Sequence, residues 1–365
     1  MGAPRLTWDF GTAYDFFVSL YVLHEPDKFG LRGVWAAGMR SRLPAAEREF
    51  LEEVEGTVTG PPLPWVYSLP APKDAVTALR ALGSIPAAER LPALVFCCSE
   101  GGLAEAKTVL LDVAARQAWD EQDLDSLREA IRPYVKEKGH DMPARKKLAT
   151  ELEWWSRSEE FGERYLKALA AYYEVFFAEE ERRIAPALQD ALARAQALAA
   201  ELSIAELVEE LSQGIRWEQA LKKDELICAP SYWCAPLVFW DELGPGRMLM
   251  LFGARPDDAA LIPGEAVPET LLRALKALSD PTRLKIMHYL TAESLTPTQL
   301  AHRLRLRPPT VIHHLQTLRV AGLVHVTVAE GKERSYAARR GAVYATCEAL
   351  QRFLGEGLPE GETSA

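Results

Sequence analysis

Apolar residues recur every three to four positions along most of the chain, a spacing that predicts a mainly helical protein. In the last quarter the pattern breaks at 279–281, where Asp280 can cap a new helix and Pro281 suits its first position. Thr296 marks the next helix start, with a proline just inside and Gln299 three residues on, which is the signature of a capping box. We therefore expect helices over 271–278, 282–290 and 297–304.

A fourth helix is expected over 308–320, after a tight turn at 305–307. Val311, Leu315 and Leu318 share one of its faces, and most residues on the other faces are polar. Two short helices that cross around a tight turn, the second polar on its outer side, form the unit that places its second helix in the major groove of DNA. The sequence thus predicts a DNA-reading helix over 308–320.

A β-hairpin is predicted directly after this helix. Gly322 ends the helix, residues 323–328 alternate between apolar and polar positions, and a Glu-Gly-Lys-Glu turn leads to a returning strand. This hairpin would be a wing, with Lys332 and Arg334 near its tip, where they could meet phosphates. The stretch 268–354 is therefore predicted to be a winged helix-turn-helix.

Side chains on the reading helix and the wing are the candidate DNA contacts. Polar groups that hydrogen-bond base edges, and one methyl-bearing group that suits a thymine methyl, are expected at the bases: Thr310, Ile312, His313 and Gln316. Cationic groups are expected at backbone phosphates: Arg307, Arg319, Lys332 and Arg334. The adjacent His313 and His314 are not expected to ligate a metal together, because neighbours on a helix point apart.

Three segments of this stretch resemble the ArsR-type bacterial repressors: 277–286, 309–324 and 330–332. The resemblance implies a dimeric, DNA-binding regulator that is often released from DNA by an effector. It covers only about the last quarter of the chain and departs from the family pattern in two places. Ile312 stands where the family usually has a small hydroxyl residue, and 298–304 lacks the cysteine pair that metal-sensing members carry in or near this helix.

The predicted DNA-binding stretch is basic, whereas the remainder of the chain is acidic. Residues 268–354 contain 13 Lys and Arg against 6 Asp and Glu, while the whole chain carries a net charge of −10. This segregation favours double-stranded DNA as the partner, because cations that neutralise phosphates release counterions and DNA repels the acidic body. The alternative is a winged module that binds a protein partner.

The rest of the chain divides by composition, and the overall expectation is a mainly α fold with small β. Residues 1–222 are interpreted as a helical body that forms the homodimer, binds a ligand, or both. Residues 223–254 hold short apolar runs between prolines and glycines, which predict a small antiparallel sheet. Residues 255–267 are expected to be a linker into the 268–354 domain, and 355–365 a disordered tail.

Aromatic residues crowd two parts of the body. One group lies between Trp8 and Tyr21, and the other between Tyr232 and Trp240. Both are interpreted first as core and second as walls of a pocket for a small apolar or aromatic effector. The charge run at 179–183 is interpreted as a solvated helix face.

No catalytic constellation is recognisable, and enzyme activity is not expected. Only His24 and His140 lie outside 268–354, and Gly-rich phosphate loops, G-x-S-x-G and H-E-x-x-H are missing. We expect no cofactor. No stretch approaches the length needed to span a bilayer, so a cytoplasmic protein without membrane contact is expected.

The cysteines leave a metal or redox sensor open as a further alternative. The residues concerned are Cys97, Cys98, Cys228 and Cys234. Their spacings match no recognised zinc site, and cysteines in a cytoplasmic protein are more often small buried hydrophobes. No metal site is therefore expected.

Overall fold

The structure, a computed structural model, describes residues 4–56, 58, 60–97, 104–138, 142–256, 268–328 and 334–355. The chain forms two compact units. Unit 1 comprises Met1–Gln196 and Ala220–Ala254, and unit 2 comprises Ala197–Gln219 and Arg255–Ala365. Residues 197–219 therefore pack with the C-terminal residues, whereas the predicted boundary at 222 places them in the helical body.

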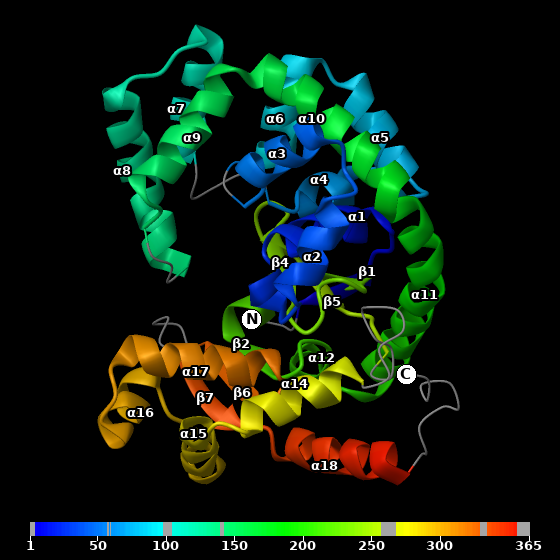
Figure 1. Cartoon of the computed structure of the whole chain (residues 1–365), viewed down its shortest axis with the longest axis vertical. Coiled ribbons are helices and arrows are strands. Elements are labelled where there is room, and N and C mark those ends of the chain that lie inside the picture. The colour runs from blue at the N-terminus through cyan, green and yellow to red at the C-terminus, as the bar shows by residue number, and fades with distance from the viewer. Residues whose placement is uncertain are drawn as a thin grey trace, which may run out of the picture. The chain divides into compact units, whose positions relative to one another are not determined.

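Unit 1 is mainly helical, in agreement with the predicted fold class (Figure 1). Its helices are α1 (Ala13–His24), η1 (Pro26–Phe29), α2 (Gly33–Arg40), α3 (Ala45–Val54), α4 (Leu63–Ser68), α5 (Ala75–Ser84), α6 (Ala87–Phe96), α7 (Ala104–Arg116), α8 (Glu121–Lys138), α9 (Arg145–Ser156), α10 (Ser158–Tyr172), the π-helical η2 (Tyr173–Phe177), α11 (Ala178–Glu201) and α13 (Glu218–Leu221). The end of α11 and the start of α13 belong to unit 2. None of the helices in the described part of the chain has the length and apolarity that crossing a membrane requires.

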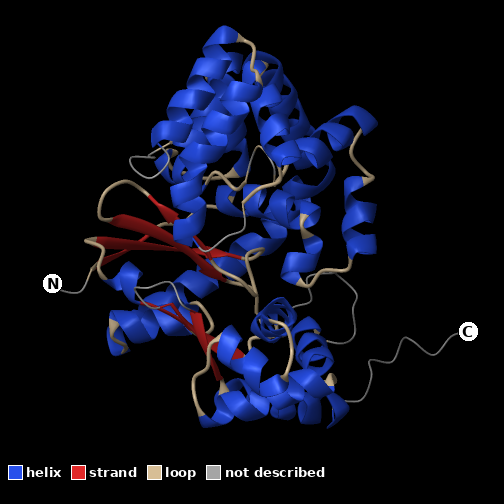
Figure 2. Ribbon diagram, turned by 90° about the vertical axis from the view of Figure 1, so that its left-hand side faces the viewer, coloured by secondary structure: helices blue, strands red, loops and turns tan. Residues whose placement is uncertain are grey.

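Unit 1 also contains a four-stranded sheet, drawn in red in Figure 2. In spatial order its strands are β1 (Arg5–Trp8), β3 (Glu225–Ser231), β5 (Arg247–Gly253) and β4 (Phe239–Glu242). The predicted antiparallel pairing holds for β4 and β5 but is wrong for the rest, because β1, β3 and β5 run parallel. Moreover, β1 comes from an N-terminal stretch that has only a helical prediction. All seven residues of β3 are buried, and a strand buried on both faces gives a continuous apolar run that does not reveal its pairing direction.

Unit 2 contains the predicted winged helix-turn-helix (Figure 1). Its elements are α12 (Ile204–Leu211), β2 (Ile215–Trp217), α14 (Glu269–Leu278), α15 (Pro281–Ala292), α16 (Pro297–Leu304), α17 (Pro308–Val320), β6 (Val324–Val328), β7 (Arg334–Ala338) and α18 (Arg340–Gly355). Helices α16 and α17 have the bounds that the sequence predicts. Strands β6 and β7 pair antiparallel as the wing, and β2 adds an unpredicted parallel strand beside β6. Helix α18 is also unpredicted.

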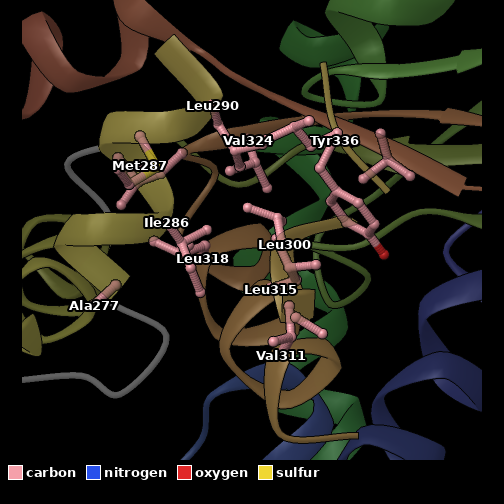
Figure 3. Packing of buried hydrophobic residues seen from close by; sticks show 14 residues of the cluster. Ala277, Ile286, Met287, Leu290, Leu300, Val311, Leu315, Leu318, Val324 and Tyr336 are labelled. Atoms are coloured by element: carbon pink, nitrogen blue, oxygen red, sulfur yellow. The ribbon is translucent and has the colours of Figure 1, made fainter. Parts of the chain in front are cut away.

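One hydrophobic core holds unit 2 together. Figure 3 shows side chains of α15, α16, α17 and the wing strands meeting in a single cluster. Val311, Leu315 and Leu318, the face predicted to be apolar, are all fully buried in it. Tyr336 of β7 closes the cluster on the side of the wing. The core therefore fixes the rotation of α17 about its own axis.

Side-chain caps begin α15 and α16 where the sequence predicts them. Asp280 accepts a hydrogen bond from the N–H of Arg283 at 2.8 Å, with Pro281 at the first helical position. The Thr296 hydroxyl accepts from the N–H of Gln299 at 3.3 Å, and the Gln299 side chain accepts from the N–H of Thr296 at 2.8 Å. These bonds satisfy backbone donors that a helix leaves unbonded in its first turn.

Replacing the Asp280 cap should lower stability in a pH-dependent way. The Arg283 N–H holds the pKa of Asp280 below its usual range, so the stabilisation is present above the ordinary aspartate pKa of about 4 and is lost as the pH falls through the lowered value. We expect Asp280→Ala to lower the thermal midpoint at pH 7 by a few degrees. The difference from the unaltered protein should shrink toward pH 3, as measured by circular dichroism.

The matched control is Asp280→Ser, which keeps an acceptor without a titrating carboxyl group. Its midpoint at pH 7 should stay near that of the unaltered protein. Coincident melting curves for Asp280→Ala and the unaltered protein at pH 7 would contradict a capping role.

Candidate nucleic-acid interface

Three exposed residues of α17 lie away from its buried face. Gln316 lies four positions after Ile312 and three after His313, so it neighbours both on the helix surface, and we call these three residues the reading surface. Ile312 is 41% exposed, although its side chain is a large apolar one. Three of the residues predicted at base edges are thus brought together on one side of a rigidly packed helix.

Thr310 and Arg307 lie at the start of the same helix. Arg307 occupies the N-cap position in an extended conformation, and its side chain is exposed. Thr310 is also exposed, but it lies on the flank of the helix, one turn before His313. Both therefore border the reading surface.

The turn between α16 and α17 depends on Arg305. This residue adopts a left-handed backbone conformation with φ 54° and ψ 42°, which favours glycine. The N–H of the following Leu306 donates to Ala301 O at 3.0 Å, which closes the end of α16. Sequence reasoning assigns no role to Arg305, although the Arg-x-Arg-x-Arg run at 303–307 marks a cationic turn. This exposed arginine lies three residues before the start of the reading helix.

Of the two cations predicted on the wing, Arg334 is among the described residues. Val328 at the end of β6 pairs with Arg334 at the start of β7, and the Arg334 side chain is exposed. Lys332 lies outside the described residues, so its predicted phosphate contact stays a prediction.

Arg319 differs from the other predicted phosphate contacts because it is half-buried on the flank of α17. Burial is the main cause that lowers its pKa to about 10, Tyr336 opposes the shift, and the charges of Arg334 and Arg339 add to it. The guanidinium remains charged at neutral pH. A cation held beside two others, at the side of the helix that faces the wing, favours the approach of an anion.

Helix α16 presents a shallow surface hollow in front of this turn. Its lining consists of Thr298, Gln299, His302 and Arg303. Arg303 is paired with Glu293 at 2.7 Å and lies over the ring of Tyr289, so its charge is already partly compensated. The hollow is too open to enclose a small molecule and suits a positioning role for the first helix of the pair.

Comparison with known proteins identifies this part of the chain. Residues 280–326, from the start of α15 into β6, match the sequence model of the arsR family of bacterial regulatory proteins. This stretch is an ArsR-type winged helix-turn-helix. Such a domain characterises DNA-binding transcriptional regulators.

Two solved structures each match about a quarter of the chain. The crystal structure of NolR from Sinorhizobium fredii is 26% identical, with 24% of this chain and 88% of that chain covered and a TM-score of 0.20. The crystal structure of the ArsR family transcriptional regulator RHA00566 is 26% identical, with 25% of this chain and 96% of that chain covered and a TM-score of 0.22. A search among curated proteins finds no match. The remaining three quarters of the chain lie outside these similarities.

The cysteines considered for sensing lie outside the ArsR-type domain. Cys228 and Cys234 are fully buried, and burial raises the pKa of the Cys228 thiol far above its ordinary value, which makes it a poor metal ligand or nucleophile. Cys97 is half-buried and Cys98 lies outside the described residues. Within the described ranges, no group of three or more His, Cys, Asp or Glu side chains could hold a metal ion.

The aromatic groups of unit 1 pack mainly as core around a buried carboxylate. Asp15 of α1 accepts hydrogen bonds from the Ser231 hydroxyl at 2.7 Å and from the Trp233 and Tyr232 N–H groups at 2.8 and 3.0 Å, and burial raises its pKa to about 6. Glu180 accepts from the Trp233 indole at 2.9 Å. Glu180 is itself buried, so the predicted solvated face at 179–183 is wrong at this position.

Arg305 provides a stability test of the turn in the ArsR-type domain. Arg305→Gly should raise the free energy of unfolding by about 0.5–1 kcal/mol, because relief of the left-handed strain outweighs the greater freedom of glycine in the unfolded chain. Arg305→Ala removes the same charge but keeps the strain, so it should bring no gain. Urea titration of both variants measures the difference, and equal stabilities of the two would contradict a strained turn.

Proposed function

We propose that the chain is a homodimeric transcriptional regulator that binds a twofold-symmetric operator through α17 and the wing. Unit 1 would receive a small apolar or aromatic effector. The observation that carries the proposal is the reading surface of Ile312, His313 and Gln316, exposed on a helix whose opposite face is buried in the core. A rigid helix with exposed hydrogen-bonding and methyl groups has what major-groove readout requires.

Each side chain of the reading surface has a chemical counterpart at a base edge. The Gln316 amide can donate and accept at once, which matches the N7 and N6 groups of adenine. His313 can donate to a purine N7 or O6, and the methyl groups of Ile312 suit the thymine methyl. Arg307, Arg319, Arg334 and Lys332 would neutralise phosphates on either side and release counterions.

Helix α18 supports the homodimer. None of its residues is buried. Two large hydrophobic side chains are among the exposed ones, Tyr344 at 70% and Leu354 at 73% exposure. These two apolar side chains share a stripe with Cys347 at helical spacing. Apolar residues aligned on an uncovered helix in the same unit as the reading helix suit pairing with a second copy, and two copies would match two operator half-sites.

The dimer prediction is tested by placing a charge on this stripe. Tyr344→Glu should shift the protein toward monomer in sedimentation equilibrium, because two copies of a carboxylate would be buried at the seam. The matched control is Ala345→Glu, which adds the same charge about 100° away around the same helix. A monomeric unaltered protein, or a Tyr344→Glu variant that dimerises normally, would contradict a seam at α18.

Readout of bases and contact with phosphates are separable in titrations. Gln316→Ala should weaken binding to the specific site by about 1–3 kcal/mol and leave random DNA nearly unaffected. Arg334→Ala should weaken both and reduce the salt slope by about 1. Gln122→Ala, an exposed glutamine on α8 of unit 1, serves as the control, and equal losses on both DNAs for the two test variants would contradict the assignment.

The specific site itself is obtained from a genomic duplex library retained at two salt concentrations. Enrichment of an inverted repeat with half-sites about one helical turn apart supports the dimeric regulator and supplies the probe for an effector screen. Absence of enrichment, with retention lost as salt rises, would favour a module that binds a protein partner instead.

A further inference from the structure

The wing sheet of unit 2 contains a strand from a distant part of the sequence. Strand β2 runs parallel to β6, with Ile215 opposite Val326 and Trp217 opposite Val328. The Val326 N–H donates to Gly214 O at 2.9 Å. One edge of the wing is therefore covered by residues that precede the ArsR-type domain by about sixty positions.

A compact turn presents this strand. Helix α12 starts with a capping box between Ser203 and Glu206. Ser212 follows as its C-cap, and the buried Ser212 hydroxyl accepts a hydrogen bond from the N–H of Ile215 at 2.9 Å. Gly214 then adopts a φ of +105°, a region that other residues rarely enter. These local interactions fix the direction in which the chain leaves α12 and enters β2.

Close contacts tie the same turn to the base of the wing. A Cβ at Gly214 would lie 2.9 Å from Arg339 Cδ and 3.0 Å from His325 Nδ1. Arg339, directly after β7, donates to Gly322 O at 2.9 Å, and Gly322 ends the reading helix. The segment therefore meets both the wing and the end of α17.

Charged groups add to the docking. Glu209 of α12 lies 2.7 Å from Arg216 Nε and 3.1 Å from His325 Nδ1 on β6. The hydrogen bond from Arg216 is the main cause that lowers the pKa of Glu209, so the carboxylate is ionised at neutral pH. This carboxylate thus joins α12 to β2 through Arg216 and lies beside His325 of β6, whose pKa is lowered by burial and whose Nδ1 forms no hydrogen bond.

We propose that the segment 203–217 is a positioning element for DNA binding. Docked on β6, it holds the wing and the end of α17 in the arrangement that lets Arg319 and Arg334 reach phosphates. Gly214 and Glu209 are its positioning residues, and neither touches DNA. The inference rests on the proposed function and adds to it a segment outside the helix-turn-helix on which DNA binding depends.

Substitution of Gly214 in the full chain tests this role. Gly214→Ala should undock β2, because the new Cβ meets Arg339 and the backbone conformation becomes strained. We expect hydrogen exchange at the Val326 amide to accelerate at least tenfold, while the α17 amides of Leu315 and Leu318 stay protected. Affinity for specific and random duplexes should fall together, and the salt slope should drop by about 1 for each phosphate that the protein no longer neutralises.

Two further variants keep the test decisive. Gly341→Ala, at a glycine with open space around it, is the control and should change neither exchange nor binding. If Gly214→Ala unfolds unit 2, Ser212→Ala takes its place in the test. This variant loosens the turn without introducing a clash and should show the same changes in milder form.

The outcomes separate this inference from the proposed function. Faster exchange at Val326 with unchanged affinity and salt slope would overturn the positioning role and leave DNA binding intact. Loss of specific binding alone, with the salt slope unchanged, would also overturn it. If the unaltered protein binds no duplex at either salt concentration, the proposed function fails and the positioning role fails with it.

Discussion

Burial of one face of α17 is the constraint on which the DNA-binding unit depends. Val311, Leu315 and Leu318 enter the core of unit 2, and full burial of each such side chain contributes about 1.5–3 kcal/mol. Rotation of the helix by even one position would expose part of this face, so the helix has one favourable orientation. Ile312 and Gln316 are therefore exposed because of residues that never contact DNA, and their identities can change with little cost to the fold.

Local signals explain why this unit could be predicted closely from the sequence. Asp280 and Thr296 begin helices by bonding to backbone groups three residues away, and the apolar spacing of α17 repeats within a few turns. Such interactions depend on neighbours in the chain and so can be recognised without a structure. The exposed positions follow directly, since they are those left over by the apolar face.

The features that the sequence does not reveal depend mostly on residues far apart in the chain. Strand β1 pairs with β3, which follows it by more than two hundred residues, and the continuous apolar runs of β3 and β5 do not reveal that these two strands pair parallel. Glu180 has the charge of a surface residue, and only the indole of Trp233 and the guanidinium of Arg183 explain its burial. The left-handed Arg305 escapes prediction for a different reason, because arginine is not the residue that this conformation favours.

The third strand of the wing makes unit 2 discontinuous along the chain. Ile215 and its partner Val326 are separated by more than one hundred residues, so at a synthesis rate of about 5–20 residues per second β2 leaves the ribosome on the order of ten seconds before β6. The wing sheet can therefore form only after β6 and β7 are made, and its third strand, β2, has been made much earlier. No single cut in the polypeptide separates the whole DNA-binding unit from unit 1, because the chain passes between the two units at three places.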